Sequence, residues 1–190
     1  MNNLSFHITD ITANSIRANA SEIGLSVEEQ DTRIVIRITD NGLGMDAETA
    51  RRVTNPFYTT RTTRKVGLGL PFLIQNAEQT GGSVTLTSEP GKGTKVRAVF
   101  HSDHIDCPPW GDLPGTVALL ITGNPEINVC FEYRSGETGY SISTNEIKDE
   151  VQTGHEKDAY TTERKTFDDY KLVEVPANAD GEMIKENIRS

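Results

Sequence analysis

Acidic and amide side chains near the start of the chain have a spacing that would suit phosphate chemistry. Asp10 and Asn14 are four residues apart in "HITDITANSIRANA", so a helix here would carry both side chains on one face. A carboxylate in such a position can orient a water or hydroxyl for attack on a phosphorus atom. An amide oxygen can complete the coordination of a Mg²⁺ ion that already holds phosphate oxygens and water. An ordinary polar helix face explains the two residues as well, so the pair needs support from other parts of the sequence.

A glycine-containing stretch, "DNGLGM", begins at Asp40, directly after an apolar run. Such a stretch can form a tight turn, a phosphate-binding loop or the floor of a pocket for a nucleotide base. Gly42 and Gly44 would let the backbone come close to a ligand, because neither residue carries a Cβ atom. Met45 fits an apolar wall of a pocket and fits the hydrophobic core equally well.

Two further stretches follow, "NPFYTTR" at 55–61 and "GLGLPF" at 67–72. The second opens a predicted helix, whose first backbone N–H groups form an anion site before any side chain is considered. Between the two stretches lies the basic segment "RTTRKV", in an otherwise acidic chain. "GLGLPF" lacks the lysine and spacing of a P-loop and the full glycine pattern of a dinucleotide-binding fingerprint, so it is weak evidence by itself.

In this order and at this spacing, "DITANS", "DNGLGM", "NPFYTTR" and "GLGLPF" resemble the N, G1, F and G2 boxes of the GHKL superfamily. This superfamily unites the ATPases of DNA gyrase, Hsp90-type chaperones, histidine kinases and MutL. The resemblance covers residues 5–101, about half of the chain. "SEPGKGTKVRAVF" adds to it, because sensor-kinase catalytic domains often end with a similar glycine turn and strand.

The resemblance gives the polar residues specific roles. It makes Asp10 the catalytic base and Asn14 a ligand of Mg²⁺. It makes Asp40 the acceptor of a hydrogen bond from the exocyclic amine of adenine. Guanine presents a carbonyl at that position, so a buried carboxylate would be left unpaired and would reject it.

The same resemblance completes a nucleotide pocket. Arg61 and Lys65 would lie in the lid and neutralise the β- and γ-phosphates, although basic loop residues are usually just exposed. Thr94 resembles the threonine that supports the adenine-binding aspartate through a water or a direct hydrogen bond. The other residues implied to line the pocket are Gly42, Gly44, Met45, Phe57, Gly67, Leu68, Gly69 and Leu70.

Departures from the family pattern bear on the subfamily. The four histidines are His7, His101, His104 and His155. None of them lies in a dimerising helical hairpin of the kind that carries the phospho-accepting histidine, so autophosphorylation within this chain alone is not expected. His7 is interpreted as an edge residue of the first helix. An acidic residue four positions before the asparagine is typical of gyrase and MutL. Aspartate in place of the more common glutamate shortens the reach to water by one methylene. Anti-sigma-factor serine kinases also carry an acidic residue there.

The predicted function is therefore a Mg²⁺-dependent ATP-binding protein that hydrolyses ATP or transfers its γ-phosphoryl group, similar to the catalytic domain of sensor histidine kinases. Two alternatives are open: a nucleotide-sensing regulatory module with negligible turnover, and an anti-sigma-type serine kinase. The expected partners are ATP and a protein partner or phospho-acceptor in signal transduction.

Composition and charge limit the other functions. The chain has 190 residues, a formal net charge of −9 and 35% hydrophobic residues, which argues against nucleic acid or an anionic membrane as the main partner. It has neither an apolar stretch of about 20 residues nor a signal peptide, so a cytoplasmic location is expected.

Cys107 and Cys130 are expected to be reduced. His101, His104 and Cys107 recur at three-residue steps that could hold Zn²⁺, but without a clear fourth ligand a plain linker is the favoured interpretation.

The elements that must position these residues follow from periodicity. The chain is predicted to begin with a helix and a hairpin of alternating apolar residues. Two helices follow, one capped by Asp46 and one that begins near Pro71. Two strands come next, at 83–88 and 94–100. The order predicts an α+β two-layer sandwich, the histidine-kinase-like ATPase fold, over residues 1–102.

The second half is predicted to form a small α+β appendage. A linker at 102–115 precedes three expected strands, "TVALLIT", "INVCFEY" and "YSIS", which would form a separate sheet. Ser143 and Glu146 would cap a helix that runs to about Val151. The accessory unit thus spans 103–151, and residues 152–190 are expected to form a poorly packed polar tail with one strand-like stretch, "YKLVEV".

Overall fold

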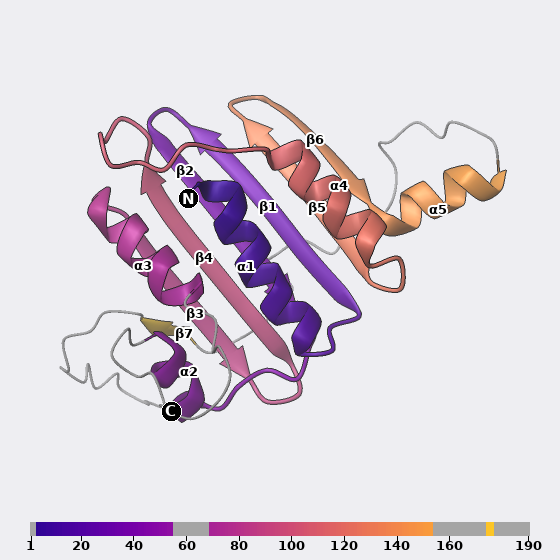
Figure 1. Cartoon of the computed structure of the whole chain (residues 1–190), viewed down its shortest axis with the longest axis horizontal. Helices are drawn as coiled ribbons and strands as arrows, with labels where there is room; N and C mark the ends of the chain where they lie inside the picture. Colours follow the sequence, from indigo (N-terminus) through magenta and orange to yellow (C-terminus); the bar gives the residue numbers. More distant parts are fainter. Residues whose placement is uncertain (1–2, 55–68, 154–173, 177–190) are drawn as a thin grey trace, which may run out of the picture.

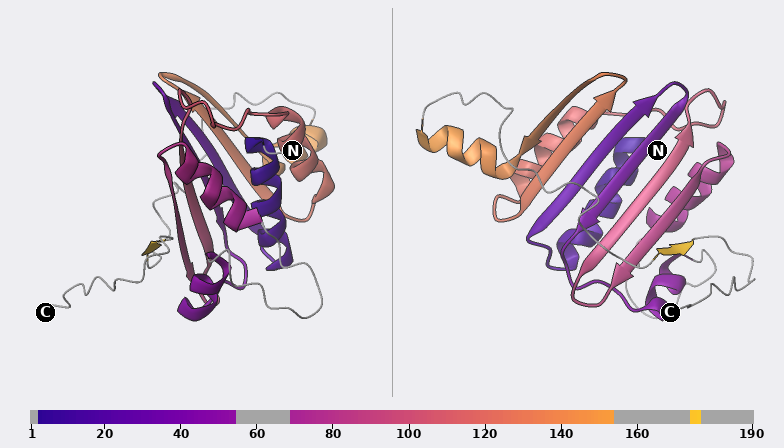
Figure 2. Two further views of the ribbon diagram at one scale, coloured as in Figure 1. Left: turned by 60° about the vertical axis from the view of Figure 1, so that its left-hand side comes forward. Right: turned by 180° about the vertical axis from the view of Figure 1, so that it is seen from behind.

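A mixed sheet with helices over one face forms the body of the molecule (Figures 1 and 2). The computed structural model describes residues 3–54, 69–153 and 174–176. The strands have the order β6-β5-β1-β2-β4-β3-β7. In chain order the elements are α1 (Leu4–Arg17), β1 (Glu22–Gln30), β2 (Arg33–Asp40), α2 (Ala47–Thr54), α3 (Gly69–Gln79), β3 (Ser83–Glu89), β4 (Gly93–His101), α4 (Leu113–Gly123), β5 (Asn128–Ser135), β6 (Thr138–Ser143), α5 (Thr144–Thr153) and β7 (Glu174–Pro176).

Alternation in the β1–β2 hairpin builds the floor of the core. The antiparallel register places Leu25 opposite Ile38 and Val27 opposite Ile36, and all four side chains are buried. Helices α1, α3 and α4 cover this face of the sheet, as the view along its edge shows (Figure 2). The predicted α+β sandwich is confirmed, and so is the predicted order of elements up to β4.

The segment after the linker differs from the prediction. "TVALLIT" is not a strand, because residues 113–123 form helix α4. Asp112 caps this helix by accepting a hydrogen bond from the backbone N–H of Gly115 at 2.9 Å, and a proline lies in its first turn. The residues that α4 buries recur at helical spacing: Leu113, Val117, Leu120 and Ile121.

The expected separate sheet is also not present in the described part of the chain. Strand β5 pairs in parallel with β1, and β6 pairs antiparallel with β5, so both extend the main sheet. Val129 and Phe131 of β5 therefore belong to the same hydrophobic core as Leu4 and Ile8 of α1. The division of the chain at residue 102 stays a prediction.

The end of the described chain agrees in part with expectation. Helix α5 begins where predicted, and Ser143 accepts a hydrogen bond from the backbone N–H of Glu146 at 3.2 Å. Glu174 and Val175, the last two residues of "YKLVEV", form β7 with the following Pro176 on the outer edge of β3. Among the described helices, none has the length and apolar character needed to cross a membrane.

Candidate functional site

Asp40 lies at the end of β2 and is held by three hydrogen bonds from three parts of the chain. Ser15 in α1 donates its hydroxyl hydrogen to Oδ2 at 2.6 Å. The backbone N–H groups of Gly42 and Thr94 donate to Oδ1 at 3.0 and 3.2 Å. The residue is only 7% exposed, so the sheet end presents a fixed, almost buried carboxylate.

The loop after Asp40 packs tightly against the protein's own backbone. A Cβ atom at Gly42 would lie 2.7 Å from the carbonyl oxygen of Ala18 at the end of α1. Gly44 has φ +65°, and a Cβ there would lie 2.0 Å from the carbonyl oxygen of Glu89. Both glycines are thus required for packing of the loop, and their approach to a ligand stays a prediction.

Met45 and Thr94 both contact Ser88, a residue that the sequence motifs did not indicate. Ser88 accepts a hydrogen bond from the backbone N–H of Met45 at 2.8 Å, and its hydroxyl lies 2.9 Å from that of Thr94. Thr94 donates its backbone N–H to Asp40, and its role in a nucleotide pocket stays a prediction. Met45 is half-buried against the core.

Asp10 lies where helices α1 and α3 meet. A Cβ atom at Gly69, the first residue of α3, would lie 2.9 Å from Asp10 Oδ2. Burial raises the pKa of Asp10, and the nearby positive charge of Arg17 partly opposes this change. Leu70 follows Gly69 into the core. The half-buried carboxylate thus faces the start of α3, and its role as a base stays a prediction.

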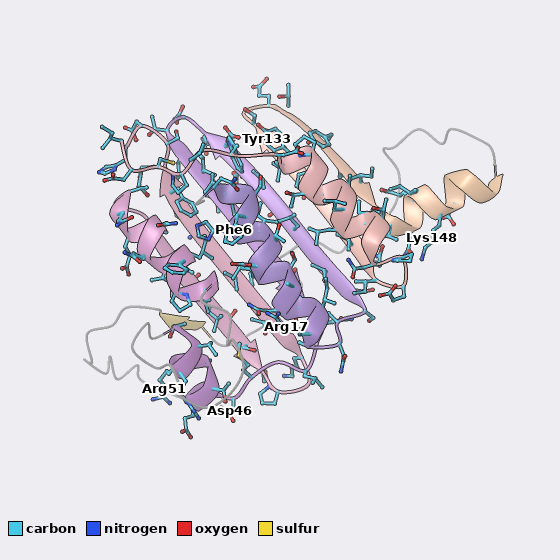
Figure 3. All side chains as sticks on the ribbon, in the orientation of Figure 1. Phe6, Arg17, Asp46, Arg51, Tyr133 and Lys148 are labelled. Carbon is cyan, nitrogen blue, oxygen red and sulfur yellow. The ribbon has the colours of Figure 1, made fainter. Side chains whose placement is uncertain are left out.

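Asn14 is exposed one turn after Asp10. Its side-chain oxygen accepts a hydrogen bond from the guanidinium group of Arg17, at the C-terminal end of α1. Figure 3 shows Arg17 at the same end of the sheet as Asp46, which caps α2 by accepting a 2.7 Å hydrogen bond from the backbone N–H of Thr49. Helix α1 therefore positions the carboxylate of Asp10, the amide of Asn14 and the hydroxyl of Ser15.

Several predicted site residues fall outside the described part of the chain. These are Phe57, Arg61, Lys65, Gly67 and Leu68. Within the described residues, no group of three or more His, Cys, Asp or Glu side chains could hold a metal ion, so a zinc site at 101–107 gains no support. Cys107 and Cys130 are not joined by a disulfide bond.

His7 has a different environment from the one expected. The prediction of an edge residue is wrong, because His7 is 1% exposed and its Nε2 lies 2.8 Å from the side-chain nitrogen of Asn76 in α3. Burial lowers the pKa of His7. The helical stripe of apolar residues around it could have indicated this burial.

The family model described as "Histidine kinase-, DNA gyrase B-, and HSP90-like ATPase" matches residues 3–104, more than half of the chain. The chain belongs to this family. The predicted resemblance is therefore confirmed, and this ATPase-family region contains Asp10, Asn14 and Asp40. A MucBP domain model matches residues 128–187.

The relatives of this histidine kinase-like chain include longer bacterial sensor proteins. A putative sensor protein of Shewanella frigidimarina is 32% identical over 97 residues, 49% of this chain and 15% of that protein. The sensor histidine kinase YxdK of Bacillus subtilis is 29% identical over 104 residues, 51% of this chain and 32% of that protein. The chain thus spans less than a third of the length of these relatives.

A solved structure shows the same fold. The Aquifex aeolicus MutL ATPase domain, complexed with ADP, matches with a TM-score of 0.52 and 15% sequence identity. The match covers 80% of this chain and 68% of that domain. The sheet with its covering helices is therefore the fold of this ATPase family.

Proposed function

We propose that this chain binds ATP with Mg²⁺, with Asp40 at the adenine end and Asp10, Asn14 and the start of α3 at the phosphate end. The observation that carries the proposal is the buried Asp40 carboxylate, fixed by α1, its own loop and β4 in a member of an ATPase family. A carboxylate with these three donors is held as an acceptor, which suits the exocyclic amine of adenine.

The chemistry of the donors fits a magnesium ion bound together with phosphate. Asn14 offers an exposed amide oxygen that Arg17 contacts. Mg²⁺ keeps most of its water and takes few protein ligands, so one amide oxygen beside the phosphates is sufficient. When bound, the ion neutralises charge on the phosphate oxygens. Asn14 would hold it after Arg17 has released the amide.

Asp10 is the proposed base for the attacking oxygen. A water or hydroxyl would form a bond to the γ-phosphorus while the bond to the β–γ bridging oxygen breaks, and Asp10 would take the proton from the attacking group. The raised pKa of the half-buried carboxyl makes it a better proton acceptor than an exposed aspartate. The positions Arg61, Lys65, Gly67, Leu68 and Phe57 are proposed to complete the pocket over the phosphates.

Hydrolysis and phosphoryl transfer are separated from simple nucleotide sensing by one experiment. Phosphate release by the full chain is compared with that of Asp10→Asn, and γ-labelled ATP is used to detect labelled protein. We expect turnover in the unaltered chain and at least a hundredfold loss in the variant, in the range of a general base. ATP binding without Asp10-dependent turnover or label would instead favour the sensing module.

The sensor-kinase relatives support a role in signal transduction with a protein partner or phospho-acceptor. We propose a cytoplasmic location, with neither nucleic acid nor a membrane as partner, because the net charge of −9 disfavours binding to polyanions. Labelling of a co-purified protein by γ-labelled ATP would test the phospho-acceptor directly.

A further inference from the structure

The hydrogen bonds to Asp40 leave one of its oxygens with more acceptor capacity than the other. An ionised carboxylate offers about two acceptor positions on each oxygen. Oδ1 receives two backbone N–H groups, from Gly42 and Thr94. Oδ2 receives the hydroxyl of Ser15. The remaining position on Oδ2 is therefore the natural acceptor for a ligand.

Ser15 controls that oxygen with a side chain, whereas the donors on Oδ1 belong to the backbone. The residue is 2% exposed and lies on α1 directly after Asn14. A serine hydroxyl has one hydrogen, and Ser15 gives it to Asp40. Because this hydrogen is already donated to Asp40, the Ser15–Asp40 pair has acceptor atoms for a ligand but no hydrogen to donate to it.

We propose that Ser15 is a positioning residue that makes the site selective for a 6-amino purine over a 6-oxo purine. This inference rests on the proposed function, because it concerns the base of the same nucleotide. An exocyclic amine donates to Oδ2, whereas a carbonyl oxygen at that position would face an acceptor and leave it unpaired.

Loss of the Ser15 hydroxyl should relax this selectivity for a specific reason. In the unaltered chain the one hydrogen of the Ser15 hydroxyl goes to Oδ2 in a nearly buried site. A water molecule that takes the place of the lost hydroxyl has two hydrogens, so it can donate to Asp40 and to a ligand at once. A carbonyl at the purine 6-position then finds a donor, and a 6-oxo purine becomes acceptable.

The experiment measures the dissociation constants of ATP and GTP by calorimetry in the presence of Mg²⁺. Ser15→Ala is compared with Ser5→Ala, a buried serine in the same helix that donates to the carbonyl oxygen of Trp110. We expect Ser15→Ala to reduce the preference for ATP over GTP about tenfold, the scale of a hydrogen bond to a charged group. Ser5→Ala should keep the preference of the unaltered chain.

The measurements distinguish a failure of the role of Ser15 from a failure of ATP binding itself. An unaltered chain that binds no ATP would overturn both. An unaltered chain that prefers ATP, together with a Ser15→Ala variant of the same preference, would overturn the role of Ser15 alone. If Ser15→Ala does not fold, Ser15→Cys has nearly the same size and a weaker donor, and it should show a smaller reduction in the same ratio.

Discussion

Asp10 and Gly69 lie so close that a Cβ atom at position 69 would be 2.8 Å from the Cβ of Asp10. The first residue of α3 thus packs directly against the proposed base, 59 positions before it in the sequence. Any side chain at position 69 must displace either the carboxylate or the start of the helix, because contacts below 3.0 Å are not tolerated.

Gly69→Ala should therefore impair turnover more than binding at the adenine end. We expect phosphate release to fall at least about tenfold, since a shift of the order of 1 Å in a reacting group is costly. Gly123→Ala is the matched control, because a Cβ at that position would meet nothing within 4 Å. Steady-state phosphate release of both variants checks this, and equal rates would show that Asp10 and α3 need not be in contact for turnover.

Asn14→Ala should weaken the binding of Mg²⁺-ATP much more than that of metal-free ATP. The reason is that the proposed amide ligand contributes only when the ion is present. Calorimetric titrations with Mg²⁺ and with EDTA give the two losses, and Asn124→Ala, at the end of α4, serves as a control. Equal losses under both conditions would mean that Asn14 does not bind the metal.

His7 should make stability depend on pH. Burial lowers its pKa from the ordinary value of 6.5, so the folded chain favours the neutral ring. Its contribution to stability is then complete above pH 6.5 and is lost as the pH falls from there through the lowered pKa of the folded state. The neighbouring cavity is lined by His7 together with apolar side chains: Ile8, Ile11, Ile36, Ile38, Leu73, Val96 and Ala98.

Urea unfolding of the unaltered chain and of His7→Gln between pH 5 and 8 measures this effect. The stability difference between the two should change with pH by at most about 1.4 kcal/mol per unit, the limit for one group. A difference that stays constant over this range would show that His7 takes up its proton equally in the folded and unfolded chain.

Phe131→Ala should destabilise the whole described fold, including the ATPase region. Phe131 is 2% exposed and shares one core with α1, so its removal should lower the free energy of unfolding by about 3 kcal/mol. Leu119→Ala is the control, because Leu119 is 72% exposed on α4. Thermal unfolding should remain a single transition at a lower temperature. A separate early transition, with the nucleotide-stabilised one unchanged, would show instead that residues 1–102 fold as an independent domain.

Local periodicity was sufficient to predict much of the fold. The apolar alternation around Ile36 and the positions of Pro71 and Asp46 marked elements that the structure contains. The strand predicted for "TVALLIT" is wrong because a short apolar run has no period that separates a buried strand from a buried helix. The parallel pairing of β5 with β1 joins residues about 100 positions apart, and no local signal reports such a contact.

The candidate site, like the fold, could be predicted from the sequence only in part. Asp10, Asn14 and Asp40 could be found from their motifs, because their residue types and spacing carry the chemistry. The bond from Ser15 to Asp40 could not, since a small residue on the apolar stripe of a helix predicts only packing. Ser88 was also missed, because its importance arises from the register that brings it opposite Thr94.

Asp40→Asn tests most directly whether Asp40 binds the adenine of ATP. The substitution keeps the shape of the side chain but replaces one acceptor oxygen with a donor, which should cost at least about 2 kcal/mol, or about thirtyfold in affinity. The measurement is the dissociation constant of Mg²⁺-ATP by calorimetry, with Asp46→Asn as a matched control at an exposed helix cap. We expect a loss of affinity for Asp40→Asn and none for Asp46→Asn. Unchanged ATP affinity in Asp40→Asn would contradict it.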